Sequence, residues 1–202
     1  MKYLTAVLAL AFTAPAAAAS LPPGIWSTVE DAAFAAEEGR EVSAEVFLEV
    51  REGGAWRNLD AFGVPQSDWA SGAIPGLAAA PQSHSGWMLG ASELRRAQRF
   101  SCWVSARKFA GKPDGAPAWT FSKAETFDQG GRIAFPGKGE APDFSLRLRN
   151  VTWVKGSTNK PSLVLYIHKD DPARAESYSW ASPDARLVGI NLRWMQGSCS
   201  RL

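Results

Sequence analysis

The chain has few of the residues that enzymes most often use for metal binding or nucleophilic catalysis. Its 202 residues include two cysteines and two histidines, which are scattered along the sequence. This spacing does not match a zinc-ligand pattern, and we expect neither a metal ion nor a cofactor. The sequence also contains no phosphate-binding glycine loop, dinucleotide-binding fingerprint or nucleophilic serine motif. No motif therefore assigns a catalytic function.

The chain also lacks an excess of charge of either sign. Its formal net charge at pH 7 is +2, and loss of Lys2 with the N-terminal segment would leave +1. A protein that follows nucleic-acid phosphates needs a strongly basic surface, which this composition does not supply. We therefore expect no nucleic-acid partner and no polybasic membrane-binding patch.

Long apolar runs are missing except at the N-terminus. Lys2 precedes an apolar stretch over residues 3–12, and small residues follow it as far as Ala19. This order is typical of a cleavable secretory signal peptide. The run is shorter than the roughly 20 residues of a membrane-spanning helix. We predict a signal peptide over residues 1–19 and one soluble domain over residues 20–202, periplasmic or secreted and without a membrane anchor.

Cys102 and Cys199 would be the cysteines of the mature chain. An isolated pair in an oxidising compartment is typically bridged, so we predict a disulfide between them. Closing a loop of roughly 100 residues would stabilise the fold by about 4 to 5 kcal/mol. The alternative is a catalytic thiol paired with His84 or His168, although neither cysteine has cysteine-protease surroundings.

Hydrophobic periodicity predicts a mostly β chain with one short helix. The helix covers residues 27–38, because Ser27 and Glu30 have capping-box spacing and Gly39 ends it. Apolar and polar residues alternate along much of the remaining chain, which is typical of half-buried strands. Many strands with little helix favour a β-sandwich of the jelly-roll or concanavalin-like type. The predicted strands cover residues 42–50, 55–59, 100–107, 119–127, 132–135, 144–149, 163–168 and 187–194.

Two connecting segments also carry a prediction. Residues 63–90 are rich in glycine, proline, alanine and serine, and we expect a long irregular segment. Such a segment serves either as a functional loop or as a packed cover over a sheet, and both remain open. Gly130 and Gly131 lie between two predicted strands, where a hairpin turn is the simplest interpretation.

One predicted hairpin, in the second half of the chain, carries the residues best suited to chemistry. Its apolar positions share one face, and the other face carries Arg147, Arg149, Tyr166 and His168. A turn at residues 157–158 would place Arg147 opposite His168 and Arg149 opposite Tyr166, about 5 Å apart at Cβ. Arginine binds carboxylates, while tyrosine and histidine transfer protons, so this face suits an anionic sugar. A solvated face without function is the alternative.

Residues on other strands extend this candidate site. The chain contains nine tryptophans, and Trp103 falls on the polar side of its strand. Exposed aromatic rings stack on the apolar faces of sugars, although most large aromatic residues belong to cores. Asn191 and Arg193 fall on the polar side of the last predicted strand. We assign Trp103, Asn191 and Arg193 to substrate binding.

Three segments resemble parts of one enzyme family. Residues 127–137, FDQGGRIAFPG, are similar to the Gly-Gly-Lys-Leu-Pro-Gly-type strand entry of jelly-roll polysaccharide lyases of the alginate and glucuronan type. Residues 144–148 resemble the arginine-bearing strand that follows in those lyases. Residues 163–168 resemble the tyrosine-bearing strand after it.

The resemblance implies a concave sheet that binds an acidic polysaccharide and cleaves it by β-elimination. Arg132 takes the place of the lysine after the paired glycines and, with Arg149, would bind substrate. Arg147 would hold the uronate carboxylate, and Tyr166 and His168 would be the base or acid. Arg132 departs from the family because arginine does not readily release its proton, and the chain ends where these lyases usually continue. An active lyase and a binding-only relative both remain open.

The predicted function is recognition of an acidic or cell-envelope polysaccharide or other glycan by an exported protein, with lyase activity left open. The alternative is a non-enzymatic envelope protein, such as an inhibitor or immunity-type factor, that binds a protein partner through residues 63–90. A concave groove lined by tryptophan and arginine would favour the glycan. A flat apolar patch of several hundred Å² would favour the protein partner.

Overall fold

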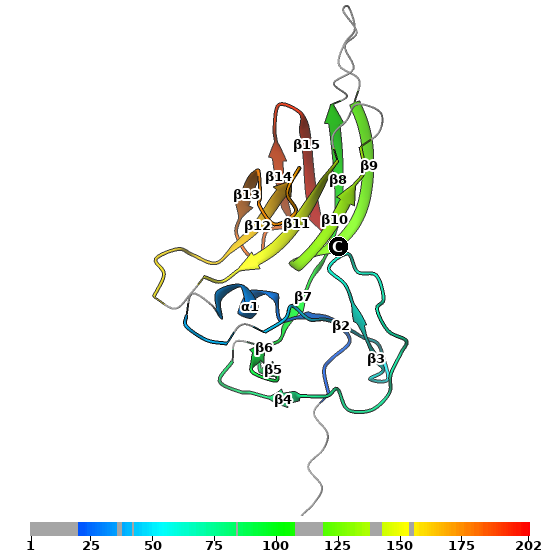
Figure 1. Cartoon of the computed structure of the whole chain (residues 1–202), viewed down its shortest axis with the longest axis vertical. Coiled ribbons are helices and arrows are strands. Elements are labelled where there is room, and N and C mark those ends of the chain that lie inside the picture. Colours follow the sequence, from blue (N-terminus) through cyan, green and yellow to red (C-terminus); the bar gives the residue numbers. More distant parts are fainter. Residues whose placement is uncertain are drawn as a thin grey trace, which may run out of the picture.

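The computed structural model describes residues 20–35, 38–41, 43–83, 85–107, 119–137, 143–153 and 156–202 (Figure 1). The signal peptide predicted over residues 1–19 and the side chain of His84 lie outside this part of the chain. The described residues form mostly antiparallel sheets, with one short helix near the N-terminus, as the sequence predicts. In Figure 1 the strands from residue 99 onward form one layered body, and the helix and earlier strands form a second body at one end of it.

The layered body consists of two four-stranded antiparallel sheets. One has the strand order β10-β11-β12-β13, with bounds Gln129–Phe135, Phe144–Val151, Ser162–His168 and Ser177–Ala181. The other has the order β14-β15-β8-β9, with bounds Leu187–Asn191, Met195–Arg201, Arg99–Arg107 and Trp119–Phe127. β13 and β15 are not among the strands predicted from the sequence.

The strands of these two sheets follow one another in chain order. Neighbours in each sheet are consecutive along the chain, except that the last strand, β15, pairs with the first, β8. A jelly roll is built from two Greek keys, which require connections that skip neighbouring strands. The antiparallel β architecture is therefore confirmed, and the predicted jelly-roll connectivity is not.

The two sheets share a core because apolar residues alternate along their strands. Phe100, Cys102 and Val104 point inward from β8, and Leu146 and Leu165 point inward from β11 and β12. Residues between these positions point outward, because successive side chains of a strand face opposite sides. The outer faces of both sheets therefore carry most of the candidate residues predicted from the sequence.

The N-terminal body contains a four-stranded sheet of order β3-β2-β1-β7 and the helix α1. The Ser27 hydroxyl accepts a hydrogen bond at 3.1 Å from the N–H of Val29, the first residue of the helix, and so satisfies one of its free N–H groups. The Glu30 carboxylate, which was expected to complete a capping box, binds Arg149 instead. The predicted hairpin of β2 with β3 is confirmed, although β2 is shorter than predicted. The bounds are Trp56–Leu59 for β3, Phe47–Val50 for β2, Gly24–Ser27 for β1, Arg95–Ala97 for β7 and Val29–Ala35 for α1.

Residues 63–90 are more regular than predicted. They contain β4 (Leu77–Ala79) and β5 (Trp87–Leu89), which form a small sheet with β6 (Ser92–Glu93). Ile74 belongs to the same apolar core as Leu48 of β2, and residues of β4 and β5 pack against that core. The segment therefore covers the N-terminal sheet, in agreement with the packed-cover alternative.

Gly130 and Gly131 form a corner between two sheets rather than the predicted hairpin turn. The corner follows β9 and opens β10, which belong to different sheets. A Cβ on Gly131 would lie 2.5 Å from the Phe127 carbonyl oxygen, and one on Gly130 would lie 2.7 Å from a methyl carbon of Val29. Only glycine permits these approaches, so this dipeptide lets the chain change sheets and brings α1 close to the corner.

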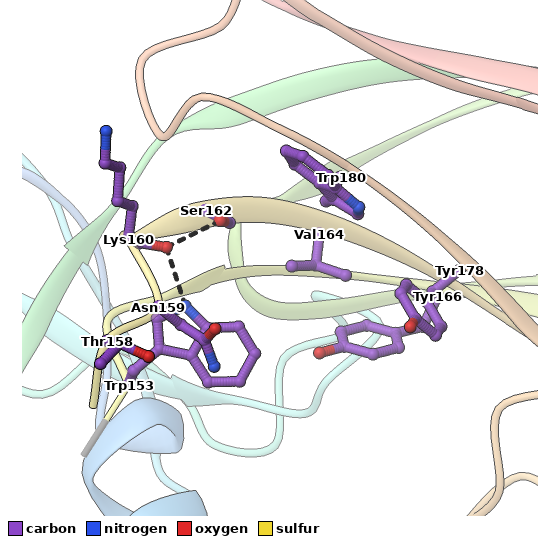
Figure 2. Close-up of a pocket in the computed structure, with 9 residues that line it drawn as sticks. All are labelled: Trp153, Thr158, Asn159, Lys160, Ser162, Val164, Tyr166, Tyr178 and Trp180. Carbon is purple, nitrogen blue, oxygen red and sulfur yellow. Dashed lines mark hydrogen bonds between the residues drawn. The ribbon is translucent and has the colours of Figure 1, made fainter.

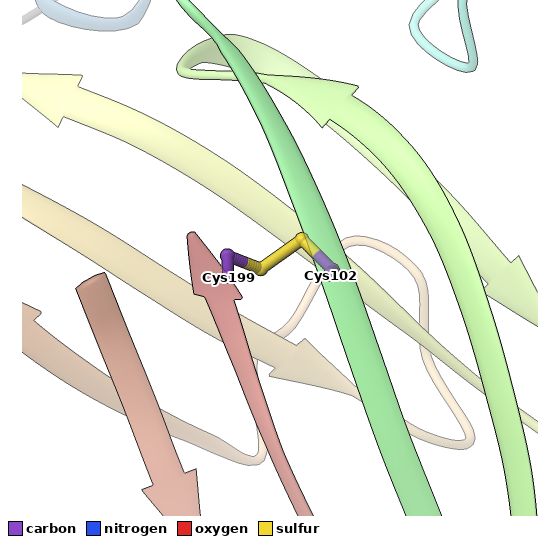
Figure 3. The surroundings of a disulfide bond; sticks show 2 residues. All are labelled: Cys102 and Cys199. Carbon is purple, nitrogen blue, oxygen red and sulfur yellow. A yellow bond between two sulfur atoms is a disulfide. The ribbon is translucent and has the colours of Figure 1, made fainter. Parts of the chain in front are cut away.

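Cys102 and Cys199 form the predicted disulfide (Figure 3). The two residues are directly paired on β8 and β15, and both are fully buried. The bond corrects the alternative of a catalytic thiol, and it is typical of proteins from oxidising, extracytoplasmic compartments. No helix in the described residues is both long and apolar enough to cross a membrane.

Replacing both cysteines by alanine should lower the free energy of unfolding by about 2 to 5 kcal/mol. The physical reason is that the unfolded chain regains the freedom lost by a bridge between residues 97 apart in sequence. Urea unfolding followed by tryptophan fluorescence measures the loss. A reducing agent should destabilise the wild type and leave the double variant unchanged. Equal stability of both proteins would contradict the structural role of the bond.

Candidate functional site

The outer face of the β10-β11-β12-β13 sheet carries a continuous row of candidate residues. Arg132, Arg147, Tyr166 and Tyr178 lie directly opposite one another on these four strands. Directly opposed side chains are about 5 Å apart at Cβ, so each member of the row is within reach of the next. Two guanidinium groups therefore stand beside two phenol rings on one surface.

The register of the β11–β12 hairpin differs from the prediction by two residues. The turn is centred between Gly156 and Ser157 rather than between residues 157 and 158, and Gly156 has a positive φ of 88°. A shift of two residues preserves the face on which each side chain lies, whereas a shift of one would reverse it. The predicted pairs of Arg147 with His168 and Arg149 with Tyr166 are therefore wrong. The observed pairs are Arg147–Tyr166, Arg149–Val164 and Ser145–His168.

Arg149 is held by a buried carboxylate of α1. Its Nε and Nη2 atoms donate to the two Glu30 carboxylate oxygens at 2.7 and 3.1 Å, and Glu30 is 1% exposed. Burial lowers the pKa of Arg149, but the bonds to Glu30 outweigh that effect and raise it. This bidentate pair anchors α1 on the outer face of β11. Arg149 is thereby engaged within the protein.

Arg147 pairs with a more accessible carboxylate, whose charge also acts on Arg132. Arg147 Nη2 donates to Glu45 at 2.7 Å, and the Glu45 side chain is 43% exposed. Burial and the neighbouring Arg147 guanidinium both lower the pKa of Arg132, while the charge of Glu45 opposes this shift. Arg132 also donates to the Pro172 carbonyl oxygen at 3.1 Å. Glu45 therefore compensates one of the two positive charges at this end of the face.

His168 lies on the same face but is covered. It is 4% exposed, and its pKa is lowered by burial and by the charges of Arg132 and Arg147. Nearby backbone groups of Asp171 and Arg174 oppose this shift only in part. The imidazole is therefore neutral near pH 7 and has little surface through which to touch a polymer.

An aromatic groove opens beside the row, over β12 and β13 (Figure 2). Its volume is about 720 Å³, within the range of roughly 300 to 1,000 Å³ that is usual for small-molecule sites. Tyr178 and Trp180 are 63% and 70% exposed, which is unusual for rings of this size. The lining residues are Trp153, Thr158, Asn159, Lys160, Ser162, Val164, Tyr166, Tyr178 and Trp180.

Trp153 and Tyr166 are the less exposed aromatic residues of this groove. The Trp153 indole N–H donates to the Lys160 carbonyl oxygen at 2.8 Å, which fixes the ring. Burial raises the pKa of the Tyr166 phenol, and the positive charge of Arg149 opposes this only in part. Tyr166 therefore keeps its proton at neutral pH and is not a base there.

The structure does not bring Trp103, Asn191 and Arg193 to this groove. Trp103 points outward from β8, on the other sheet, and is 41% exposed. Asn191 ends β14, and Arg193 follows it in the turn before β15. The neighbouring Trp194 ring lies 5.7 Å from the Lys169 ammonium, just past the end of β12 that is remote from Lys160. The predicted substrate-binding residues are thus distributed over two surfaces.

Of the nine residues that line the groove, the sequence predicted a site role only for Tyr166, and the aromatic residues Trp153, Tyr178 and Trp180 were missed. Tyr178 and Trp180 belong to β13, whose sequence SYSWA alternates aromatic with small residues. A period of two over five residues was the signal that could have identified this strand. Trp153 lies in the β11–β12 connection, where no periodicity applies.

Neither relatives nor a metal site assign a function. Comparison of the chain with protein-family models, curated proteins and solved structures gives no match. Within the described residues, no three His, Cys, Asp or Glu side chains are grouped so that they could hold a metal ion. The geometry of the outer faces of the two four-stranded sheets is therefore the basis for a function.

Glu30→Gln should lower the free energy of unfolding by about 3 to 5 kcal/mol, because it leaves the Arg149 charge buried without its carboxylate. Glu45→Gln is the matched control. It breaks the more exposed pair with Arg147 and should cost about 1 kcal/mol or less. Urea unfolding of both variants measures the difference. Similar small losses in both would contradict the anchoring role of Glu30.

The protein should lose stability as the pH falls below 6.5, the ordinary pKa of histidine. The folded-state pKa of His168 is lowered, so between the two pKa values the unfolded chain binds more protons than the folded protein. Stability in that window therefore rises with pH. Urea unfolding on either side of pH 6.5 should show a smaller pH dependence for His168→Phe than for the wild type. If the stability of His168→Phe depends on pH as much as that of the wild type, groups other than His168 cause the pH dependence.

Proposed function

We propose that this protein is an exported glycan-binding protein that holds an acidic or cell-envelope polysaccharide in the aromatic groove. The proposal is carried by four rings that line one groove, namely Trp153, Tyr166, Tyr178 and Trp180. Aromatic rings offer flat apolar surfaces on which the C–H faces of sugars stack, and the groove exposes two of these rings to solvent. A concave aromatic surface also suits a glycan better than it suits a flat protein interface.

The polar lining of the groove favours an acidic sugar. Thr158, Asn159 and Ser162 provide hydroxyl and amide groups that match sugar hydroxyls. Lys160 borders the groove with its ammonium group pointing away from the rings (Figure 2), and none of the lining residues is a carboxylate. A uronate chain therefore meets attraction and no direct repulsion within the groove.

We favour binding over cleavage, because the residues that an elimination would use are engaged or covered. Glu45 binds Arg147, Glu30 binds Arg149, and His168 is almost fully buried. Tyr166 keeps its proton at neutral pH. The resemblance to jelly-roll polysaccharide lyases still makes β-elimination worth testing. The proposal of glycan binding depends neither on that resemblance nor on a jelly-roll connectivity.

The proposed location is the periplasm or the cell exterior. The N-terminal residues have the composition of an export signal, and the Cys102–Cys199 bond is of a kind that persists in oxidising compartments. Cell-envelope and extracellular polysaccharides occupy the same compartments, so location and proposed ligand agree.

A protein partner at residues 63–90 has less support than a glycan. Within this segment, Ile74 is buried in the N-terminal core, and Leu77, Trp87 and Leu89 pack against that core. Val64 is 52% exposed, but these four larger apolar side chains are turned inward, where a partner does not reach them.

Trp180→Ala should weaken binding of a polyuronate to the mature protein by about tenfold, because it removes the most exposed ring of the groove. Phe62→Ala is the control, since Phe62 is 50% exposed but lies in the N-terminal body, away from the groove. Calorimetric titration with a panel of acidic and neutral polysaccharides measures both variants.

The same mixtures report cleavage, because β-elimination creates an unsaturated uronate that absorbs ultraviolet light. Binding without this absorbance supports the proposal. An absorbance increase that Arg147→Ala abolishes would make the protein a lyase instead. If no glycan binds, the proposal fails and a protein partner becomes the better explanation.

A further inference from the structure

The groove presents aromatic rings from more than one side. Trp153 comes from the connection after β11, whereas Tyr178 and Trp180 come from β13. In Figure 2 the indole rings of Trp153 and Trp180 lie on different sides of Val164, which projects from β12 between them. A sugar held over Val164 would therefore have aromatic rings on two sides.

Trp153 is fixed in this position by contacts that a ligand does not need to supply. Its N–H is bonded to the Lys160 carbonyl oxygen, so the polar atom of the indole is already satisfied. Its ring lies 6.5 Å from the ring of Phe34 in α1. The backbone φ of Trp153 is +61°, a conformation that a bulky residue keeps only where its surroundings hold it. Trp153 is thus a preformed wall of the groove.

The stereochemistry of a sugar decides whether both of its faces can stack. A pyranose whose substituents are all equatorial carries its hydroxyl groups around the rim and C–H groups on both faces. One axial hydroxyl makes one face polar, and stacking would bury that hydroxyl against aromatic carbon without a hydrogen-bond partner. In a β-1,4-linked chain, each sugar is turned over relative to the one before it, so successive sugars present opposite faces to the same side of the groove. With aromatic rings on both sides of the groove, the axial hydroxyl of every sugar meets one of the rings.

We propose that the aromatic groove selects β-1,4-linked pyranose chains with all-equatorial substituents over their C2 epimers, in which one hydroxyl is axial. This inference rests on the proposed glycan binding and adds the stereochemistry of the ligand. Trp153 imposes the selection, because it supplies the wall opposite the rings of β13.

Oligomers of β-1,4-linked glucuronate and β-1,4-linked mannuronate test the inference, because at equal length they share charge and linkage and differ in the C2 hydroxyl. Calorimetric titration of the mature wild type should give a Kd about tenfold lower for the glucuronate oligomer. Trp153→Gly removes the wall, and glycine adopts a positive φ without strain. This variant should bring the ratio of the two Kd values close to one, mainly by weakening glucuronate binding.

Trp103→Ala is the matched control, since it removes an outward tryptophan from the other sheet and should leave the ratio unchanged. Trp153→Phe keeps an aromatic wall, so it should keep the preference for glucuronate. If Trp153→Gly does not fold, the ratio of the two Kd values is measured for Trp153→Phe and Trp180→Ala. The preference should persist in Trp153→Phe and be lost in Trp180→Ala.

The outcomes separate the inference from the proposed function. Equal Kd values for the two oligomers in the wild type would overturn the inference and leave glycan binding intact. A preference that survives in Trp153→Gly would also overturn it, because the selection would then come from elsewhere. If neither these oligomers nor other glycans bind, the proposed function fails and the inference fails with it.

Discussion

The buried ion pair between Glu30 and Arg149 determines which part of the outer face remains open. It joins residues 119 apart in sequence and holds α1 against β11. Because neither charge can be left alone in a buried site without a large cost, the helix has one favourable position on the sheet. Val29 beside Gly130 adds a steric constraint at the same place. The helix therefore covers the β11 side of the face and leaves β12 and β13 uncovered.

This arrangement changes how the arginines contribute to recognition. Isolated on an open sheet, Arg132, Arg147 and Arg149 would form a cationic surface suited to a polyanion. In the folded protein Glu30 and Glu45 compensate most of that charge. Ion pairs that are already formed give little further energy to a ligand, which would have to displace a carboxylate first. For the proposed glycan, affinity would then come mainly from stacking in the groove, with the exposed Lys160 as a nearby positive charge.

The parts of this structure that depend on local pattern were accessible from the sequence, and the parts that depend on distant contacts were not. The alternation in β8, β11 and β12 identifies these strands and their buried faces. The disulfide follows from the number of cysteines and the export signal. Glu30 and Glu45 were not identified as partners, because they are 119 and 102 residues from the arginines that they bind. The register of the β11–β12 hairpin was predicted wrongly because alternation is the same after a shift of two residues. Only the position of the turn at Gly156 distinguishes the two registers.

β13 shows why the groove itself was missed and why it argues for function. Sequence reasoning treats large apolar residues as buried, but Tyr178 and Trp180 occupy the outward positions of this strand, with small residues facing inward. β13 also lies at the edge of its sheet, where exposed aromatic residues favour unwanted association between chains. Polar residues at these two positions would remove that hazard without disturbing the core, because neither ring packs within it. The rings therefore contribute little to folding and carry a cost in solution, a combination that is reasonable for residues whose contacts are completed by a ligand.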